Sequence, residues 1–212
     1  MTKNIIYTHL KGLLQVRENI SIPLSGAEMA KLPVLENAFL VLSNGKVQDY
    51  GTMDNFNRNA WPEYEQKEAH GRYVLPAFCD SHTHSVFAAY REEEFVMKIQ
   101  GASYADIAQK GGGILNSAKK ISTIDEKSLF DSSLERINTM IDSGIGALEI
   151  KSGYGLDLEN ELKMLSVINT LKEKLSIPIK RTFLAAHAIP EAFKDKKRDY
   201  VDEIVNHWIP FV

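Results

Sequence analysis

Two histidines stand on alternate positions directly after a short apolar run: His82 and His84 in "PAFCDSHTH", residues 76–84. On a β-strand, residues i and i+2 project to the same face, about 6 to 7 Å apart along the chain. Two such imidazoles can converge on one ion, because zinc takes nitrogen ligands at about 2.0 Å. Asp80, one step back on that face, could orient a ligand or brace the strand end. The pattern favours a metal site.

The alternative interpretation is a pair of surface or hydrogen-bonded histidines, since a His-x-His pair also arises by chance. A hydrolytic metal centre usually has about three or four protein ligands and an open position for water, so this pair alone does not complete one. The other histidines are His9, His70, His187 and His207. None repeats the pairing, and of these only His187 ends a predicted strand.

A parallel sheet would bring these residues to one edge. From Thr123 the chain alternates predicted helix and strand, with a capping box at Thr123 and Glu126 and a helix that stops at Gly144. "GALEIKSGYG" predicts a strand that runs into a glycine-rich loop, and Asp157 can cap the following helix. "IKRTFLAAHAIP" predicts another buried strand. Strand–helix alternation indicates parallel βα units, in which function collects at the carboxyl ends of the strands.

The first part of the chain shows a different sequence pattern, of short β-prone runs joined by turns. "FLVLSNGKVQDYG" places Asn44-Gly45 between two β-prone runs, which is a strong hairpin signal. Residues 17–35 are left as loop. We therefore expect two domains: a small β-rich domain over residues 1–75 and an α/β domain over residues 76–212.

Composition indicates a globular protein and limits its partners. Hydrophobic residues make up 44%, charged residues 25%, and the net charge is −3. That balance gives no electrostatic reason to expect nucleic acid or an anionic membrane. Cys79 is the single cysteine, which excludes an internal disulfide, and its place within a strand suggests a small buried hydrophobe. With no signal peptide or apolar spanning stretch, we expect a cytoplasmic protein.

Four motifs in order carry a specific resemblance: "FCDSHTHSVFAAYREEEF", "IQGASYADIAQKGGGI", "EIKSGYGLDLENELKML" and "TFLAAHAIP". Together they resemble the imidazolonepropionase family of the amidohydrolase superfamily, which acts in histidine degradation. One departure is "FAAYRE", where the family often carries glycines before the arginine. The resemblance implies the first half of a (β/α)₈ barrel, preceded by part of a small composite β domain.

The resemblance also implies roles for single residues. His82 and His84 would be the first two ligands of one zinc or iron ion. Arg91 would bind the substrate's propionate carboxylate, and Tyr154 and His187 would contact the substrate. Judged without the resemblance, Arg91 is a surface arginine, Tyr154 a packed loop aromatic and His187 a structural histidine. Lys151 is expected to be structural or to lie outside the metal's ligand set.

The implied reaction is hydrolytic opening of 4-imidazolone-5-propanoate to N-formimidoyl-L-glutamate, in an enzyme that forms homodimers. A barrel takes about 250 residues, so the chain reads as an N-terminal half. We expect the general base and further ligands from the other half, no turnover by the chain alone, and association through its open strand edges. The alternatives are another cyclic amidohydrolase or deaminase, such as a dihydroorotase-like enzyme, or a non-catalytic remnant.

Overall fold

A computed structural model describes residues 4–17, 23–109 and 111–212 of the chain. The chain divides into two compact units, Met1–Pro76 and Ala77–Val212, each with its own sheet.

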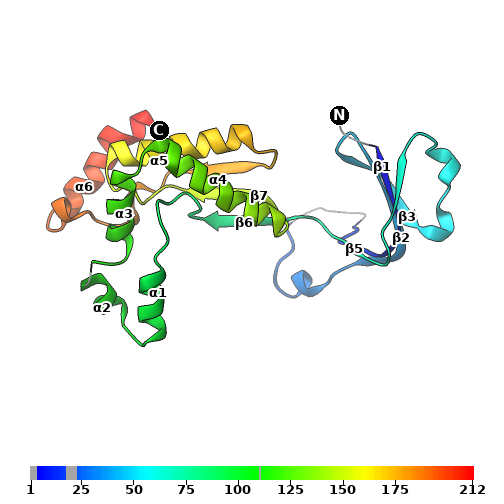
Figure 1. The fold of residues 1–212 in the computed structure, drawn as a ribbon, viewed down its shortest axis with the longest axis horizontal. Helices are drawn as coiled ribbons and strands as arrows, with labels where there is room; N and C mark the ends of the chain where they lie inside the picture. Colours follow the sequence, from blue (N-terminus) through cyan, green and yellow to red (C-terminus); the bar gives the residue numbers. More distant parts are fainter. Residues whose placement is uncertain (1–3, 18–22, 110) are drawn as a thin grey trace. The chain divides into compact units, whose positions relative to one another are not determined.

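The first unit is built on a five-stranded sheet in the order β3-β2-β1-β4, with β5 paired to β1 (Figure 1). The strands are β1 (Ile5–Leu14), β2 (Val34–Ser43), β3 (Lys46–Thr52), β4 (Glu65–Glu68) and β5 (Tyr73–Val74). β2 and β3 pair antiparallel through Asn44 and Gly45, whose φ angles are 50° and 75°. Positive φ at both central residues is what a tight hairpin turn requires, so the predicted hairpin is confirmed.

Residues of β2 pack alternately into two apolar clusters. Ala38 and Leu40 enter one cluster, whereas Phe39 and Val41 enter the other. Because side chains alternate across a strand, β2 is packed on both faces. The segment expected to be a loop contains a short 3₁₀ turn, Gly26–Ala30, and its residues 18–22 lie outside the described part of the chain.

The second unit contains three parallel strands in the order β6-β7-β8. They are β6 (Phe78–Thr83), β7 (Ile145–Lys151) and β8 (Ile179–Thr182). Its helices are α1 (Glu92–Ile99), α2 (Tyr104–Gln109), α3 (Ile114–Thr123), α4 (Glu126–Asp142), α5 (Leu158–Lys174) and α6 (Lys197–Glu203). α4 and α5 lie along the strands, while α1 and α2 stand off from them (Figure 1). The predicted alternation of strand and helix, with parallel strands, is confirmed.

The core of the second unit lies where α4 and α5 cover the sheet. Ile137 of α4, Ile150 of β7 and Ile168 of α5 are all fully buried in one cluster. This follows from the apolar stripe of α5, whose residues recur at helical spacing. Asp157 caps α5 as predicted, since its carboxylate accepts the N–H of Asn160 at 2.8 Å.

The predicted capping box is wrong. Thr123 ends α3, and its hydroxyl donates to the carbonyl of Lys120 at 3.1 Å. Thr and Ser hydroxyls often bond back to the preceding helical turn in this way, which removes them from a cap. Asp125 caps α4 instead, accepting the N–H of Ser128 at 2.9 Å.

Two further expectations need correction. Cys79 is exposed, because the described elements leave its side of β6 uncovered. The strand predicted to end at His187 ends at Thr182, and His187 lies on a 3₁₀ turn, Ala185–His187. The chain leaves the sheet there because the N–H of Leu184 donates to Ser152 Oγ at 3.0 Å rather than to a neighbouring strand.

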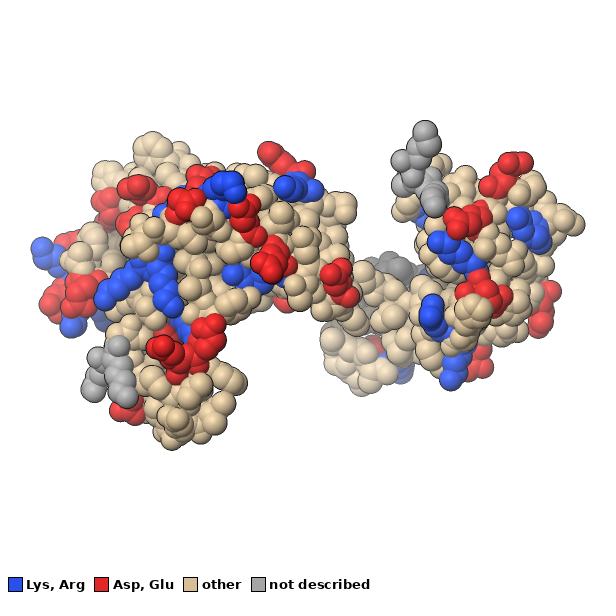
Figure 2. Space-filling view, viewed as in Figure 1, with Lys and Arg blue, Asp and Glu red and all other residues tan. Residues whose placement is uncertain are grey.

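In the part of the chain that the structure describes, every helix is too short or too polar to cross a membrane. On the face seen in Figure 2, acidic side chains lie beside basic ones over both units. This mixture agrees with a composition that favours neither sign of charge strongly.

Truncating the core should destabilise the second unit. Ile168→Ala removes a fully buried side chain and is expected to lower the free energy of unfolding by about 2 to 5 kcal/mol. Ile99→Ala, at an isoleucine that is 72% exposed on α1, is the matched control and should change it by less than about 0.5 kcal/mol. Urea denaturation followed by circular dichroism measures both. Equal effects of the two substitutions would contradict the assigned core.

Candidate active site

The aromatic residues singled out by sequence lie together in the second unit. The ring of His84 stacks on that of His187, with centroids 4.7 Å apart and an interplanar angle of 13°. The ring of Tyr154 also stacks on that of His84, with centroids 5.0 Å apart. The ring of His82 lies 6.0 Å from that of His84. Residues from β6, the loop after β7 and the turn after β8 thus meet at the carboxyl ends of three parallel strands.

Arg91 joins this group through a shared cavity. A hollow of about 190 Å³ is lined by residues of three segments: His84, Phe87, Ala89, Tyr90, Arg91, Ser117 and Tyr154. Three of the five predicted site residues therefore face one small cavity. His187 stacks on two of them, and His82 adjoins one.

The end of β6 presents the two histidines. Thr83 between them is buried, and its hydroxyl donates to the Glu149 carbonyl at 2.7 Å. The N–H of His82 donates to Asp80 Oδ1 at 3.2 Å, so Asp80 braces the strand end. Because Thr83 points toward β7, His82 and His84 on either side of it project from the opposite face of the strand.

A carboxylate that sequence reasoning missed holds the loop after β7. Glu161 of α5 is fully buried, and it accepts the N–H groups of Gly153, Gly155 and Leu156 at distances from 2.7 to 3.2 Å. Burial raises the pKa of Glu161, and these hydrogen bonds, with one from Ser152, oppose the rise. The only signal in the sequence is an acidic residue beside the apolar stripe of α5.

The turn that carries His187 is tied to the same loop. The phenol of Tyr200, a fully buried residue of α6, donates to the carbonyls of Ala185 at 3.0 Å and Leu156 at 3.3 Å. Gly153 packs against the histidine ring so closely that a Cβ there would lie 3.0 Å from His187 Nδ1. The two segments therefore form one hydrogen-bonded assembly.

Arg91 stands at the start of α1, directly before Glu92. Its guanidinium lies 3.4 Å from the Glu94 carboxylate. Glu94 also accepts the N–H of Gly113 at 3.0 Å and the side-chain amide of Asn116 at 3.2 Å. The glycine run at 111–113 is thereby connected to Arg91.

A second arginine organises the segment between the histidines and Arg91. The guanidinium of Arg136 lies over the ring of Phe87, 3.5 Å from its centroid, and donates to the carbonyl of Ser85. Its Nε donates to the hydroxyl of Tyr90 at 3.4 Å. A planar guanidinium suits this combination of stacking and several hydrogen bonds, whereas a lysine would not.

Burial keeps the central imidazoles neutral. Burial, followed by positive charge on His187, His82 and Lys151, lowers the pKa of His84 to about 4 against the opposing effect of Glu149. The pKa of His187 is also lowered, chiefly by burial. Metal ions bind neutral imidazole, so both rings are in the protonation state that a ligand requires near neutral pH.

The donor set fits part of a metal site. Among the described residues, His84 Nδ1 is buried and has no hydrogen-bond partner. Within residues 4–17, 23–109 and 111–212, however, no group of three or more His, Cys, Asp or Glu side chains is arranged to hold an ion. The His82–His84 pair supplies two of the three or so protein ligands that a catalytic zinc needs.

Lys151 is engaged in a nearly buried ion pair. Its ammonium lies 2.5 Å from the Glu149 carboxylate, and both side chains are less than 15% exposed. Hydrogen bonds with Lys151 and Thr182 help to lower the pKa of Glu149 despite burial. This pairing agrees with the expected structural role for Lys151.

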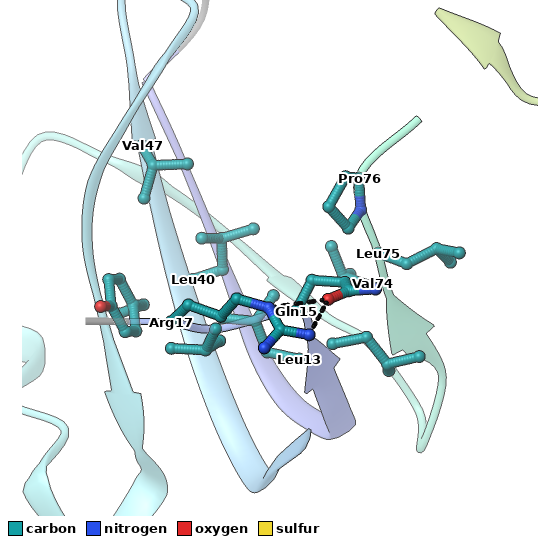
Figure 3. A pocket seen from close by; sticks show the side chains of 11 residues that line it. Leu13, Gln15, Arg17, Leu40, Val47, Val74, Leu75 and Pro76 are labelled. Carbon is teal, nitrogen blue, oxygen red and sulfur yellow. Dashed lines mark hydrogen bonds between the residues drawn. The ribbon is translucent and has the colours of Figure 1, made fainter. Parts of the chain in front are cut away.

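A second, apolar hollow lies in the first unit and has a different character. It occupies about 390 Å³ and is lined by β-strand residues that include Leu13, Leu40 and Val74 (Figure 3). The one ionic group in its lining, Arg17, hydrogen-bonds to Gln15 Oε1. This hollow offers no converging acid, base or ligand set for hydrolysis.

The phenol of Tyr154 should report the charge of Arg91. Burial raises the pKa of Tyr154, and Arg91 opposes that rise because a cation favours the phenolate. Arg91→Ala is therefore expected to raise this pKa further, whereas Lys98→Ala, which removes an exposed cation from the same helix, should leave it unchanged. NMR titration of ¹³C-labelled tyrosine measures the shift, and Tyr154→Phe assigns the signal. A lower pKa in Arg91→Ala would contradict the shared cavity.

Solved structures share the fold at low identity. Guanine deaminase from E. coli matches with a TM-score of 0.56 at 12% identity, covering 98% of this chain and 43% of that one. An atrazine chlorohydrolase from Arthrobacter aurescens, complexed with zinc, matches with a TM-score of 0.54 at 12% identity, covering 96% of this chain and 43% of that one. An uncharacterised metal-dependent hydrolase from Pyrococcus furiosus matches with a TM-score of 0.52 at 14% identity, covering 85% of this chain and 50% of that one. At such identities the likeness shows the fold alone.

Sequence relatives are much closer. No family model matches the chain. A curated imidazolonepropionase of Flavobacterium johnsoniae is 49% identical over 205 residues, and that of Christiangramia forsetii is 45% identical over 208. These matches cover 95% and 98% of this chain but 49% and 50% of the relatives. The chain is therefore a relative of the imidazolonepropionases, as its four motifs predict, and it spans about half of their length.

Proposed function

We propose that the chain forms part of a metal-dependent hydrolase that opens the ring of 4-imidazolone-5-propanoate to N-formimidoyl-L-glutamate in histidine breakdown. The observation that carries the proposal is the cavity shared by His84, Tyr154 and Arg91, in a chain 49% identical to a curated imidazolonepropionase. A small cavity with buried neutral imidazoles and one cation suits a small anionic ring compound.

The proposed architecture extends the three parallel strands. Residues 76–212 would be the first half of a (β/α)₈ barrel, and residues 1–75 would contribute the N-terminal part of a composite β domain. The strand order β6-β7-β8 and the likeness to larger hydrolases support this. In such barrels the site lies at the carboxyl ends of the strands, where the candidate residues of this chain meet.

His82 and His84 are the proposed ligands of one zinc or iron ion. When bound, such an ion makes hydroxide available near neutral pH by lowering the pKa of a coordinated water. The zinc in the Arthrobacter hydrolase supports a metal in a protein of this fold. The remaining ligands and the general base are expected from the half of the relatives' length that this chain does not span.

The chain's own residues would bind and orient the substrate. Arg91 would pair with the propionate carboxylate, for which a planar guanidinium with paired N–H donors is suited. The hydroxyl of Tyr154 and the imidazole of His187, whose rings stack 5.5 Å apart, would hydrogen-bond to the imidazolone ring. The stacked rings would keep bulk water from one side of the cavity. We further propose a cytoplasmic homodimer.

Ring opening and metal content test the proposal directly. A protein that carries this chain at the full length of its relatives should convert imidazolonepropionate to N-formimidoylglutamate with about one equivalent of zinc or iron bound. His82→Asn and His84→Asn should each lower the bound metal, whereas His207→Asn, at a side chain 68% exposed, should not. Mass spectrometry of the product and elemental analysis measure both. Full metal content in the two site variants would rule out the assigned ligands.

Removing the proposed carboxylate receptor should weaken binding. Arg91→Ala is expected to raise the KM for imidazolonepropionate about 10- to 100-fold, the usual cost of losing a hydrogen bond to a charged group. Arg198→Ala, at a side chain 86% exposed on α6, is the control. Steady-state kinetics measure the change, together with an imidazolone that lacks the carboxylate. An equal loss with both compounds would count against the role and favour another cyclic amidohydrolase or a deaminase.

A further inference from the structure

We propose that Glu161 is a positioning residue: its buried carboxylate fixes the loop over residues 152–156 and so holds the Tyr154 ring against His84 and His187. The inference rests on the proposed function in taking Tyr154 to contact the substrate. The positioning contact itself is a property of this chain alone.

The carboxylate is fully committed to the loop. Oε1 of Glu161 accepts the N–H groups of Gly155 at 2.7 Å, Gly153 at 3.1 Å and Leu156 at 3.2 Å, and Oε2 accepts that of Gly153 at 3.0 Å. The side chain has no exposed surface. Backbone donors that converge on one buried anion form a rigid connection, because breaking any of them leaves a polar group unpaired.

The loop needs such an acceptor because of its backbone conformation. Leu156 has a φ of 60°, which costs strain for any residue with a Cβ, and Gly153 has a φ of 108°. Gly155 lies so close to α5 that a Cβ there would stand 2.4 Å from the Glu161 nitrogen. Segments with such backbones persist only where surrounding contacts determine them, and here the contacts converge on one side chain.

The loop in turn places the Tyr154 ring at the cavity. Tyr154 lies between Gly153 and Gly155, the two residues whose N–H groups are bound most closely to Glu161. Its ring lies 5.0 Å from that of His84 and 5.5 Å from that of His187. Loss of the acceptor should therefore displace the tyrosine ring relative to both imidazoles.

Glu161 does not act on the substrate itself in this arrangement. Tyr154 lines the cavity beside Arg91, whereas Glu161 is not among the lining residues. Both carboxylate oxygens are occupied by backbone donors, so neither is directed to a reacting atom. Its effect on the reaction must pass through the loop.

Tyr200 provides a second, independent connection in the same assembly. Its hydroxyl donates to the carbonyls of Leu156 and Ala185 and so joins the loop to the turn that carries His187. Its ring packs separately against Phe193 and Trp208. Tyr200→Phe removes the hydroxyl alone and leaves this packing in place.

The first test observes the 212-residue chain directly. In Glu161→Gln, one oxygen is replaced by an NH₂ group that faces backbone donors, so the amide protons of Gly153, Gly155 and Leu156 should move upfield and exchange faster. The ¹³C-labelled ring signals of Tyr154 should shift toward those of free tyrosine. Glu159→Gln removes the same charge from an exposed side chain of the same helical turn and should change neither.

The second test uses the protein at the full length of its relatives. Glu161→Gln should lower kcat/KM about 10- to 100-fold, as expected for a misplaced contact residue. In a Tyr154→Ala background the same substitution should lower it less than about 2-fold, because residues that act through one another are not additive. A merely structural carboxylate would lower kcat/KM by equal factors in both backgrounds.

The outcomes separate the two proposals. Unchanged Tyr154 signals in folded Glu161→Gln, or equal factors in both backgrounds, would overturn the positioning role. If that variant does not fold, Tyr200→Phe decides: with Glu161 still holding the loop, the Tyr154 signals should stay in place while those of His187, whose turn loses a hydrogen bond, move. Tyr154 signals displaced in Tyr200→Phe would overturn the positioning role. Displaced signals in a protein that does not open imidazolonepropionate would leave the positioning role standing and remove the proposed function.

Discussion

The candidate site depends on a buried carboxylate and a strained loop that satisfy each other. Glu161 without donors would be an unpaired charge in a low-dielectric interior, which proteins tolerate poorly. The loop without an acceptor would leave three N–H groups unpaired beside Leu156 in a left-handed conformation. Neither the buried carboxylate nor the loop conformation would be stable here without the other, so the sequence must supply both. The placement of Tyr154 is a consequence of that mutual requirement.

The opposite side of the cavity is built on the same plan with different groups. Arg91 is held by Glu94, whose carboxylate also binds the backbone of Gly113. Arg136 holds the intervening segment through carbonyl oxygens and stacks on Phe87. In each case a charged side chain from one element satisfies backbone groups of another. The cavity lining is therefore fixed by ionic groups beside it rather than by apolar packing alone.

Sequence reasoning reached the residues whose signals are local. The hairpin at Asn44, the cap at Asp157 and the alternation that pairs His82 with His84 depend on neighbours a few positions apart. Glu161 was missed because a helical pattern assigns acidic residues to the solvent side, and only the fold of the preceding loop reverses that assignment. The exposure of Cys79 depends on which elements pack against its side of β6, and no local pattern contains that information.

The two sides of the cavity differ in charge. Burial and neighbouring cations lower the pKa of His84 to about 4 and keep it neutral near pH 7, while Arg91 supplies a guanidinium cation. One side of the cavity is thus neutral and aromatic, and the other is cationic. In the proposed function, this difference would orient the substrate with its carboxylate at Arg91 and its ring against the imidazoles. A metal ion at His82 and His84 would then face the ring rather than the carboxylate, so Arg91 must compete successfully with the metal for that anion. The pairing of Arg91 with Glu94 bears on this competition, because Glu94 holds the guanidinium in place while weakening its attraction for the substrate's carboxylate.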